Sequence, residues 1–106
     1  MTQALYEAVR LKYRENAIKI CVIIADAPPH GLNQGGNDGF PKGNPLGHDP
    51  IKVAKQMAKL GIILYVVACE PSLSKYKGAH DLMAGLAKIT EGRYLPLTGI
   101  ISINFA

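Results

Sequence analysis

The sequence predicts an α/β fold, a partial doubly wound (Rossmann-like) sheet of three parallel strands with helices on both faces. Helical and extended segments alternate along the 106 residues, and the stretches between the strands are long enough for parallel pairing. The first two extended segments are unbroken apolar runs, which is typical of strands that are covered on both faces. Each run leads to an acidic residue close to a proline, as at the ligand-binding edge of such a sheet.

The first part of the chain predicts one helix, one strand and a long loop. Apolar residues at helical spacing indicate a helix over about residues 3–14. Residues 18–25 follow as the first strand. Residues 27–48 are rich in glycine and proline, and loops of this length are uncommon in compact domains unless they have a function. We therefore expect a functional or partner-facing loop there.

A second helix is predicted from about residue 50, followed by a second strand. Asp49 is a suitable N-cap, and Pro50 suits the first helical position because the missing N–H is not needed there. Gly61 supplies the left-handed residue that ends the helix. Residues 62–68 are a continuous apolar run and form the predicted second strand.

The last part of the chain predicts a third helix and a short third strand. The helix covers about residues 76–90, and Gly92 is expected to end it. Residues 93–97 form the strand, and Pro96 indicates an edge position because proline lacks a backbone N–H. Residues 1–97 are predicted to form one domain, which the family resemblance given below implies is incomplete, and the tail at 98–106 fits either a strand or part of a final helix.

The charge pattern gives little support to nucleic-acid binding. The net charge is +4, with 12 Lys and Arg against 8 Asp and Glu, and the basic residues are spread along the chain. Lys52, Lys55 and Lys59 form a stripe on the second predicted helix. We interpret this stripe as a solvated helix face, and an anionic partner is the alternative.

Other features indicate a cytoplasmic chain. No apolar run reaches the roughly 18 residues that span a bilayer, so no membrane span is expected, and the start of the chain lacks a signal-peptide pattern. Cys21 and Cys69 both lie in apolar runs and have no zinc-type spacing. We expect them to be buried and reduced.

Asp26 is the first candidate site residue. Six apolar residues, 20–25, run directly into this carboxylate, and Pro28 and Pro29 then break the strand. A buried parallel strand delivers an acidic side chain to the ligand-binding edge in this way. Glu70 follows the second strand, so both carboxylates are expected at the same edge.

Four motifs give the chain a resemblance to a known family. They are Ile-Ile-Ala-Asp-Ala-Pro-Pro-His-Gly at 23–31, Asp-Gly-Phe-Pro at 38–41, Gly-His-Asp-Pro at 47–50 and Leu-Tyr-Val-Val-Ala-Cys-Glu-Pro at 64–71. Together they resemble the carboxyl-terminal half of a von Willebrand factor A domain, of the type found beside atypical α-kinase domains in protists and fungi.

The resemblance implies metal-assisted recognition of a protein partner. In that family a divalent ion, usually Mg²⁺, is held by an Asp-Xaa-Ser-Xaa-Ser motif, a Thr and an Asp after the fourth strand. Asp26 takes the role of this last Asp. A carboxylate from the partner can complete the octahedral shell of the ion.

The chain departs from the family upstream of Asp26. No Asp-Xaa-Ser-Xaa-Ser motif occurs in residues 1–25, which the pattern fills with one helix and one strand. One carboxylate is a weak Mg²⁺ site, so we expect no tight Mg²⁺ binding in this chain. The strand at 20–25 also becomes an apolar edge, and we expect self-association through it.

Other ligand sets are alternatives to the Mg²⁺ site. His30, Asp38 and His48 flank or lie in the Gly-rich loop and, with Glu70, are expected near the ligand edge. His30, Asp38, His48 and Asp49 could gather a transition metal, although Asp49 is better used as an N-cap and the spacing is not that of a zinc site. Phosphate binding is weaker still, because the loop has no phosphate-binding motif.

A catalytic function is a separate alternative. Cys69 is a candidate nucleophile at the edge, and Glu70 with Asp26 is a candidate acid–base pair. Structural or solvated roles explain these residues better than catalysis does, so we predict a binding module and no enzyme. The alternatives are a regulatory or targeting segment of an α-kinase-type serine/threonine protein kinase, and a degenerate structural fragment without a metal site.

Overall fold

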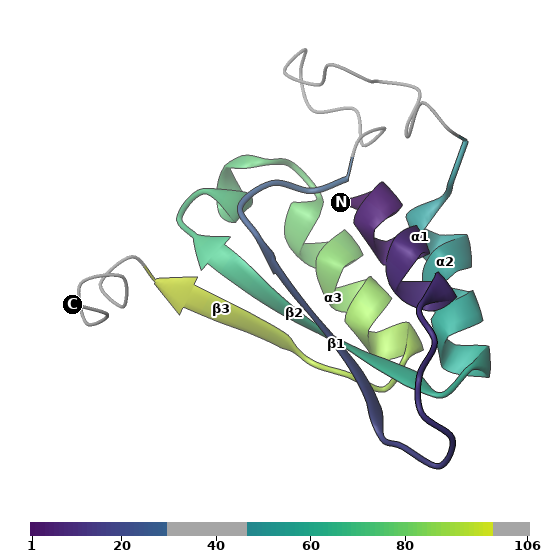
Figure 1. Ribbon diagram of the computed structural model, residues 1–106. Helices are drawn as coiled ribbons and strands as arrows, with labels where there is room; N and C mark the ends of the chain where they lie inside the picture. The colour runs from purple at the N-terminus through teal and green to yellow at the C-terminus, as the bar shows by residue number, and fades with distance from the viewer. Residues whose placement is uncertain (30–46, 99–106) are drawn as a thin grey trace.

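The computed structural model describes residues 1–29 and 47–98. Their elements, in chain order and shown in Figure 1, are α1 (Thr2–Arg10), β1 (Lys19–Ala25), α2 (Pro50–Lys59), β2 (Ile62–Glu70), the short 3-10 helix η1 (Leu73–Lys75), α3 (Ala79–Ile89) and β3 (Tyr94–Thr98). The three strands form one parallel sheet in the order β1-β2-β3. This arrangement confirms an α/β fold with a partial Rossmann-like sheet of three parallel strands.

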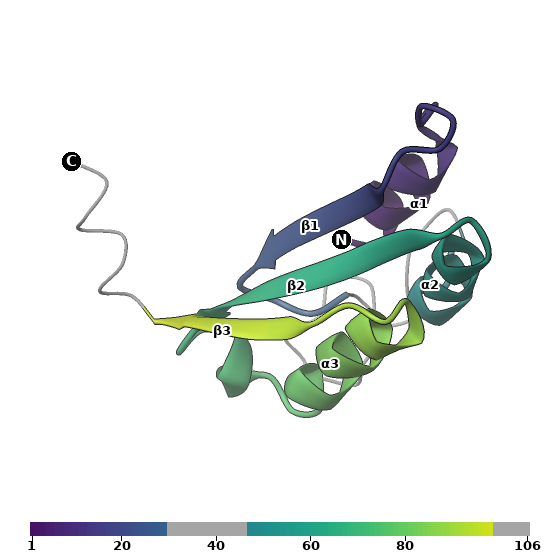
Figure 2. The same cartoon turned by 90° about the horizontal axis from the view of Figure 1, so that it is seen from below.

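The helices cover one face of the sheet in the described residues, whereas we expected helices on both faces. Figure 2 shows α1, α2 and α3 on the same side of the three strands. On β2 the side chains toward the helices are buried and the alternate ones are only partly buried. On β1 the pattern alternates between partly buried and exposed, so this strand is not covered on both sides either.

The second face of the sheet, which we call the open face, is apolar. Strand register places side chains from all three strands on it: Ile20, Val22, Ile24, Ile63, Tyr65, Val67, Cys69, Leu95 and Leu97. Four of these are large hydrophobic residues that are at least 45% exposed: Ile20, Val22, Ile24 and Leu95. The continuous apolar runs in the sequence therefore arise from a buried face and an exposed face of similar composition.

The core lies between the sheet and the helices. Leu5 of α1, Met57 of α2 and Met83 of α3 are fully buried beneath the helical layer. They pack in one cluster with the inward side chains of β2, including Leu64. The largest buried contributions therefore come from the central strand and the three helices, as expected for a two-layer domain.

The start of α2 and its end follow the sequence prediction. The Asp49 carboxylate accepts a hydrogen bond from the backbone N–H of Ile51 over 2.9 Å, and Pro50 is the first helical residue. Gly61 has a φ of 73°, the left-handed conformation that glycine adopts without steric cost. None of the helices in the described part of the chain is long and apolar enough to cross a membrane.

The other helix ends differ from the prediction. The first helix stops at Arg10 rather than near residue 14, because Leu11 is extended and the Tyr13 hydroxyl donates to the Ala8 carbonyl over 2.9 Å. The third helix begins at Ala79 rather than residue 76, because Gly78 is in the left-handed conformation with a φ of 74°.

Gly92 has a different role from the predicted helix stop. Glu91 holds the left-handed position with a φ of 64°, and its N–H donates to the Lys88 carbonyl over 3.0 Å. The Gly92 N–H donates to the Ala87 carbonyl over 2.9 Å, which completes a Schellman-type end. A Cβ on Gly92 would collide with the carbonyl oxygen of Leu64 in β2. Glycine is thus required there by the close approach of the neighbouring strand.

Candidate functional site

Asp26 lies where the sequence places it, directly after β1 at the carboxyl edge of the sheet. Its side chain is exposed. A pocket of about 500 Å³ adjoins it, lined by Met1, by Ala4 of α1 and by residues 23–28. Among these lining residues Asp26 has the one charged side chain, and the other side chains are apolar.

Glu70 shares this edge but is already engaged in structural hydrogen bonds. Ala25 pairs with Ala68, so Asp26 and Glu70 end adjacent parallel strands. Glu70 Oε2 accepts the backbone N–H of Ser74 over 3.1 Å, which orders the turn that leads into η1. These bonds occupy the carboxylate that the sequence suggested as a partner for Asp26.

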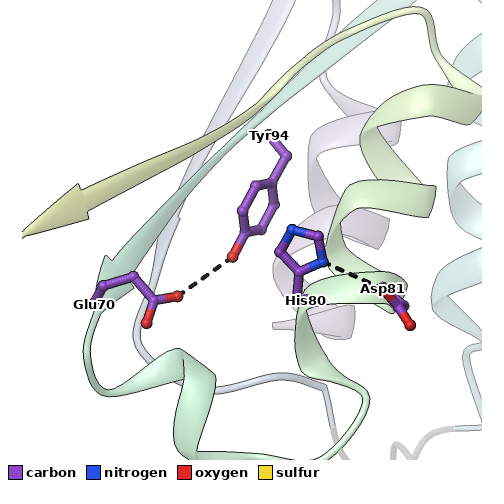
Figure 3. Close-up of polar contacts among 4 residues, drawn as sticks. All are labelled: Glu70, His80, Asp81 and Tyr94. Carbon is purple, nitrogen blue, oxygen red and sulfur yellow. Dashed lines mark hydrogen bonds and ion pairs between the residues drawn. The ribbon is translucent and has the colours of Figure 1, made fainter.

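The second oxygen of Glu70 faces β3 (Figure 3). The Tyr94 hydroxyl donates to Glu70 Oε1 over 3.4 Å. Burial raises the pKa of the Tyr94 phenol, and the negative charge and hydrogen bond of Glu70 raise it further. Tyr94 therefore stays protonated and remains a donor over a wider range of pH than an ordinary tyrosine.

His80 extends this group of side chains toward α3. Its ring packs edge-on against Tyr94, with 4.7 Å between the ring centroids. Its Nδ1 lies 3.3 Å from Asp81 Oδ1, and both side chains are largely exposed. Tyr94, His80 and Asp81 are not among the site residues predicted from the sequence. No motif marks them, because the strand register and the docking of α3 bring them together.

His48 takes part in packing between helices rather than at the end of β1. Its ring stacks on Tyr6 of α1 with 3.8 Å between the centroids and 16° between the ring planes. Asp49 is occupied as the N-cap of α2, as predicted. His30 and Asp38 lie outside the described residues.

Metal-ligating side chains do not gather within residues 1–29 and 47–98. In these ranges no three His, Cys, Asp or Glu side chains are close enough to hold one metal ion. Asp26 thus offers a single carboxylate, whereas Mg²⁺ takes octahedral oxygen coordination and releases its water reluctantly. The described residues can therefore supply one ligand to a Mg²⁺ ion, but they cannot supply a complete coordination shell.

The cysteines are free and partly buried, rather than fully buried as expected. Cys69 lies on the open face, which the described helices leave uncovered. Cys21 faces the helical layer from the edge strand, where cover is incomplete, and burial raises the pKa of its thiol. A raised pKa lowers the thiolate fraction at neutral pH, which is unfavourable for a nucleophile.

No family model, curated protein or solved structure matches the chain in comparisons with known proteins. The resemblance to von Willebrand factor A domains therefore rests on the four sequence motifs.

Proposed function

We propose that this chain is part of a protein-binding module of von Willebrand factor A type. The observation that carries the proposal is the exposed carboxylate of Asp26 directly after a parallel strand, at the carboxyl edge of the sheet. In the family that the motifs resemble, an Asp in this place holds the ion to which a partner binds. The function is recognition, with no chemical step.

In the complete domain, Asp26 would supply one oxygen ligand to Mg²⁺, and segments outside this sequence would supply the others. A hard, hydrated cation suits a carboxylate at an exposed edge, where water and a carboxylate of the partner can fill the remaining positions. Glu70 holds the turn before η1 and the start of β3 in place beside this position. We therefore assign Glu70 a supporting role.

Metal binding by the natural polypeptide tests this proposal. The transcript upstream of this chain should encode an Asp-Xaa-Ser-Xaa-Ser motif, and the encoded polypeptide should bind Mn²⁺, a spectroscopic substitute for Mg²⁺. Electron paramagnetic resonance measures the free Mn²⁺ directly. We expect Asp26→Ala to abolish the tight binding in that polypeptide.

Asp81→Ala is the matched control, because Asp81 is also an exposed carboxylate near the same edge. It should leave Mn²⁺ binding unchanged. For the 106-residue chain alone, we expect little change in melting temperature with Mg²⁺, because weak binding stabilises only when the ion exceeds its dissociation constant. Tight Mn²⁺ binding that survives Asp26→Ala would contradict the proposal.

A further inference from the structure

Basic and apolar side chains gather at the amino-terminal edge of the sheet, opposite Asp26. They come from the end of α1, the loop into β1 and the end of α2. We call this surface the basic corner, and its residues are Arg10, Leu11, Lys12, Arg14, Ile18, Lys19, Lys59 and Leu60. Five of the eight are cationic, and Glu15 is the one acidic residue in the loop.

Specific contacts hold this loop against the ends of both helices. The Tyr13 hydroxyl donates to the Ala8 carbonyl of α1 over 2.9 Å. The Lys19 ammonium donates to the Leu60 carbonyl after α2 over 3.1 Å and lies 5.9 Å from the centroid of the Tyr13 ring. These contacts fix the position of the loop, which projects at the bottom of the molecule beyond α1 in Figure 1.

The projecting side chains include large apolar residues that pack poorly. Ile18 is 84% exposed, Leu11 is 63% exposed and Leu60 is 44% exposed. Lys12 and Arg14 are exposed beside them. Single exposed apolar residues are ordinary on protein surfaces, but here three lie among five cations.

Helix electrostatics account for only part of this arrangement. Arg10 and Lys59 lie in the last turns of α1 and α2, where cations stabilise the negative end of the helix dipole. Leu11 and Ile18 are uncharged and lie outside both helices, so the helix dipole does not account for their exposure. A ligand that binds both cationic and aliphatic side chains would explain why these residues lie together on the surface.

We propose that the basic corner docks on a membrane surface that contains anionic lipids. The cations lie near the headgroup phosphates, and Leu11 and Ile18 enter the boundary between headgroups and acyl chains. Peripheral membrane sites combine these two features, apolar insertion and attraction to anionic lipid. Nucleic acid fits less well, because single-stranded chains stack on aromatic side chains, whereas the exposed tips here are aliphatic.

Vesicle flotation tests this proposal on the 106-residue chain, because bound protein rises with the vesicles while aggregated protein sinks. We expect binding to vesicles of phosphatidylcholine with about one third phosphatidylserine, and much weaker binding to phosphatidylcholine alone. Binding should fall as salt is raised from low ionic strength to several times the physiological level, because salt screens the cations.

Two paired substitutions locate the surface. Lys12→Ala with Arg14→Ala should lower the partition coefficient roughly thirtyfold, because each of the two cations near an anionic surface contributes about 1 kcal/mol. Lys75→Ala with Lys77→Ala is the matched control, with the same charge change and spacing at the opposite edge, and should have little effect.

Leu11→Ser with Ile18→Ser tests apolar insertion and should also lower the partition coefficient on the order of tenfold. Ile51→Ser with Leu95→Ser changes two exposed apolar residues outside the basic corner and outside residues 20–25, and is the control. Circular dichroism checks that each variant folds.

Equal binding to both kinds of vesicle would overturn the proposal, as would equal losses in the paired variants and their controls. Binding to polyglutamate or duplex DNA without any binding to vesicles would assign the basic corner to an acidic protein or to nucleic acid instead.

Discussion

The Thr90 hydroxyl completes the backbone hydrogen bonding of Leu64 in the middle of the core. Its Oγ1 accepts the N–H of Leu64 over 2.8 Å and donates to the Ala87 carbonyl over 2.9 Å. Thr90 is 5% exposed and Leu64 is fully buried, so water cannot replace this hydroxyl easily. One side chain thus ties the end of α3 to the central strand.

Thr90→Val should destabilise the fold by about 1–3 kcal/mol, because it leaves the Leu64 N–H buried without a partner. Valine preserves the shape of the side chain, so the loss reports the hydroxyl group. Urea unfolding followed by circular dichroism measures the difference. Thr90→Ser keeps the hydroxyl and should lose less stability than Thr90→Val. Equal losses of stability in the two variants would contradict this role.

Gly92→Ala should destabilise the chain by at least about 1–3 kcal/mol, the usual cost of forcing extra atoms into a packed site. The added Cβ meets the backbone of Leu64, which cannot turn away as a side chain could. Gly85→Ala is the opposite case, because a Cβ there meets nothing within 4 Å inside α3. It should stabilise by about 0.5–1 kcal/mol through helix propensity. Thermal unfolding of both variants checks the pair.

Stability should decrease as the pH rises above the ordinary pKa of cysteine, about 8.5. Burial raises the pKa of Cys21, Tyr13 and Tyr94 in the folded chain. A group with a raised pKa binds its proton more tightly when folded, so its stabilisation is complete below the unfolded pKa and disappears above the folded pKa. The free energy of unfolding, measured in urea between about pH 7 and 11, should therefore fall.

Cys21→Ser separates the contributions to this alkaline loss. Without the thiol, the decrease should begin later, nearer the ordinary tyrosine pKa of about 10. An unchanged onset would show that Cys21 does not contribute.

Self-association through residues 20–25 remains a prediction. Within the described residues, β1 pairs with β2 alone, and its Ile20, Val22 and Ile24 side chains are exposed. Light scattering should give a mass above the 11.4 kDa of one chain, and Val22→Lys should reduce it, because charge blocks edge pairing. Gln56→Lys adds the same charge at an exposed position of α2 and should leave the measured mass unchanged. A monomer at high concentration would refute the prediction.

Local signals in the sequence were sufficient for the order and type of the three α-helices and three strands, for both ends of α2 and for part of the candidate site. Asp49 and Pro50 located the start of α2 because capping depends on neighbouring residues only. Gly61 located its end for the same reason. The apolar run at 20–25 placed Asp26 at the carboxyl edge, because a strand followed by a break fixes where its last side chain lies.

Features that depend on tertiary contacts could not be predicted. Gly92 reads as a helix stop, and only the approach of Leu64 shows why glycine is needed. The sequence suggests that Glu70 is a free carboxylate, but in the fold the Tyr94 side chain of β3 reaches it and donates a hydrogen bond. The one-sided helical cover was also missed, because both faces of β1 and β2 have similar apolar composition.

The open face also has a consequence for the heat capacity of unfolding. Apolar surface that is already hydrated in the folded chain adds nothing to the heat-capacity change when the chain unfolds. For the described fold, Ile20, Val22, Ile24 and Leu95 contribute less to that change than covered residues would. We therefore expect a heat-capacity change of unfolding below about 12–15 cal/mol/K per residue, which is the usual range for globular proteins. The curve of stability against temperature should be correspondingly flat, with weaker destabilisation on cooling.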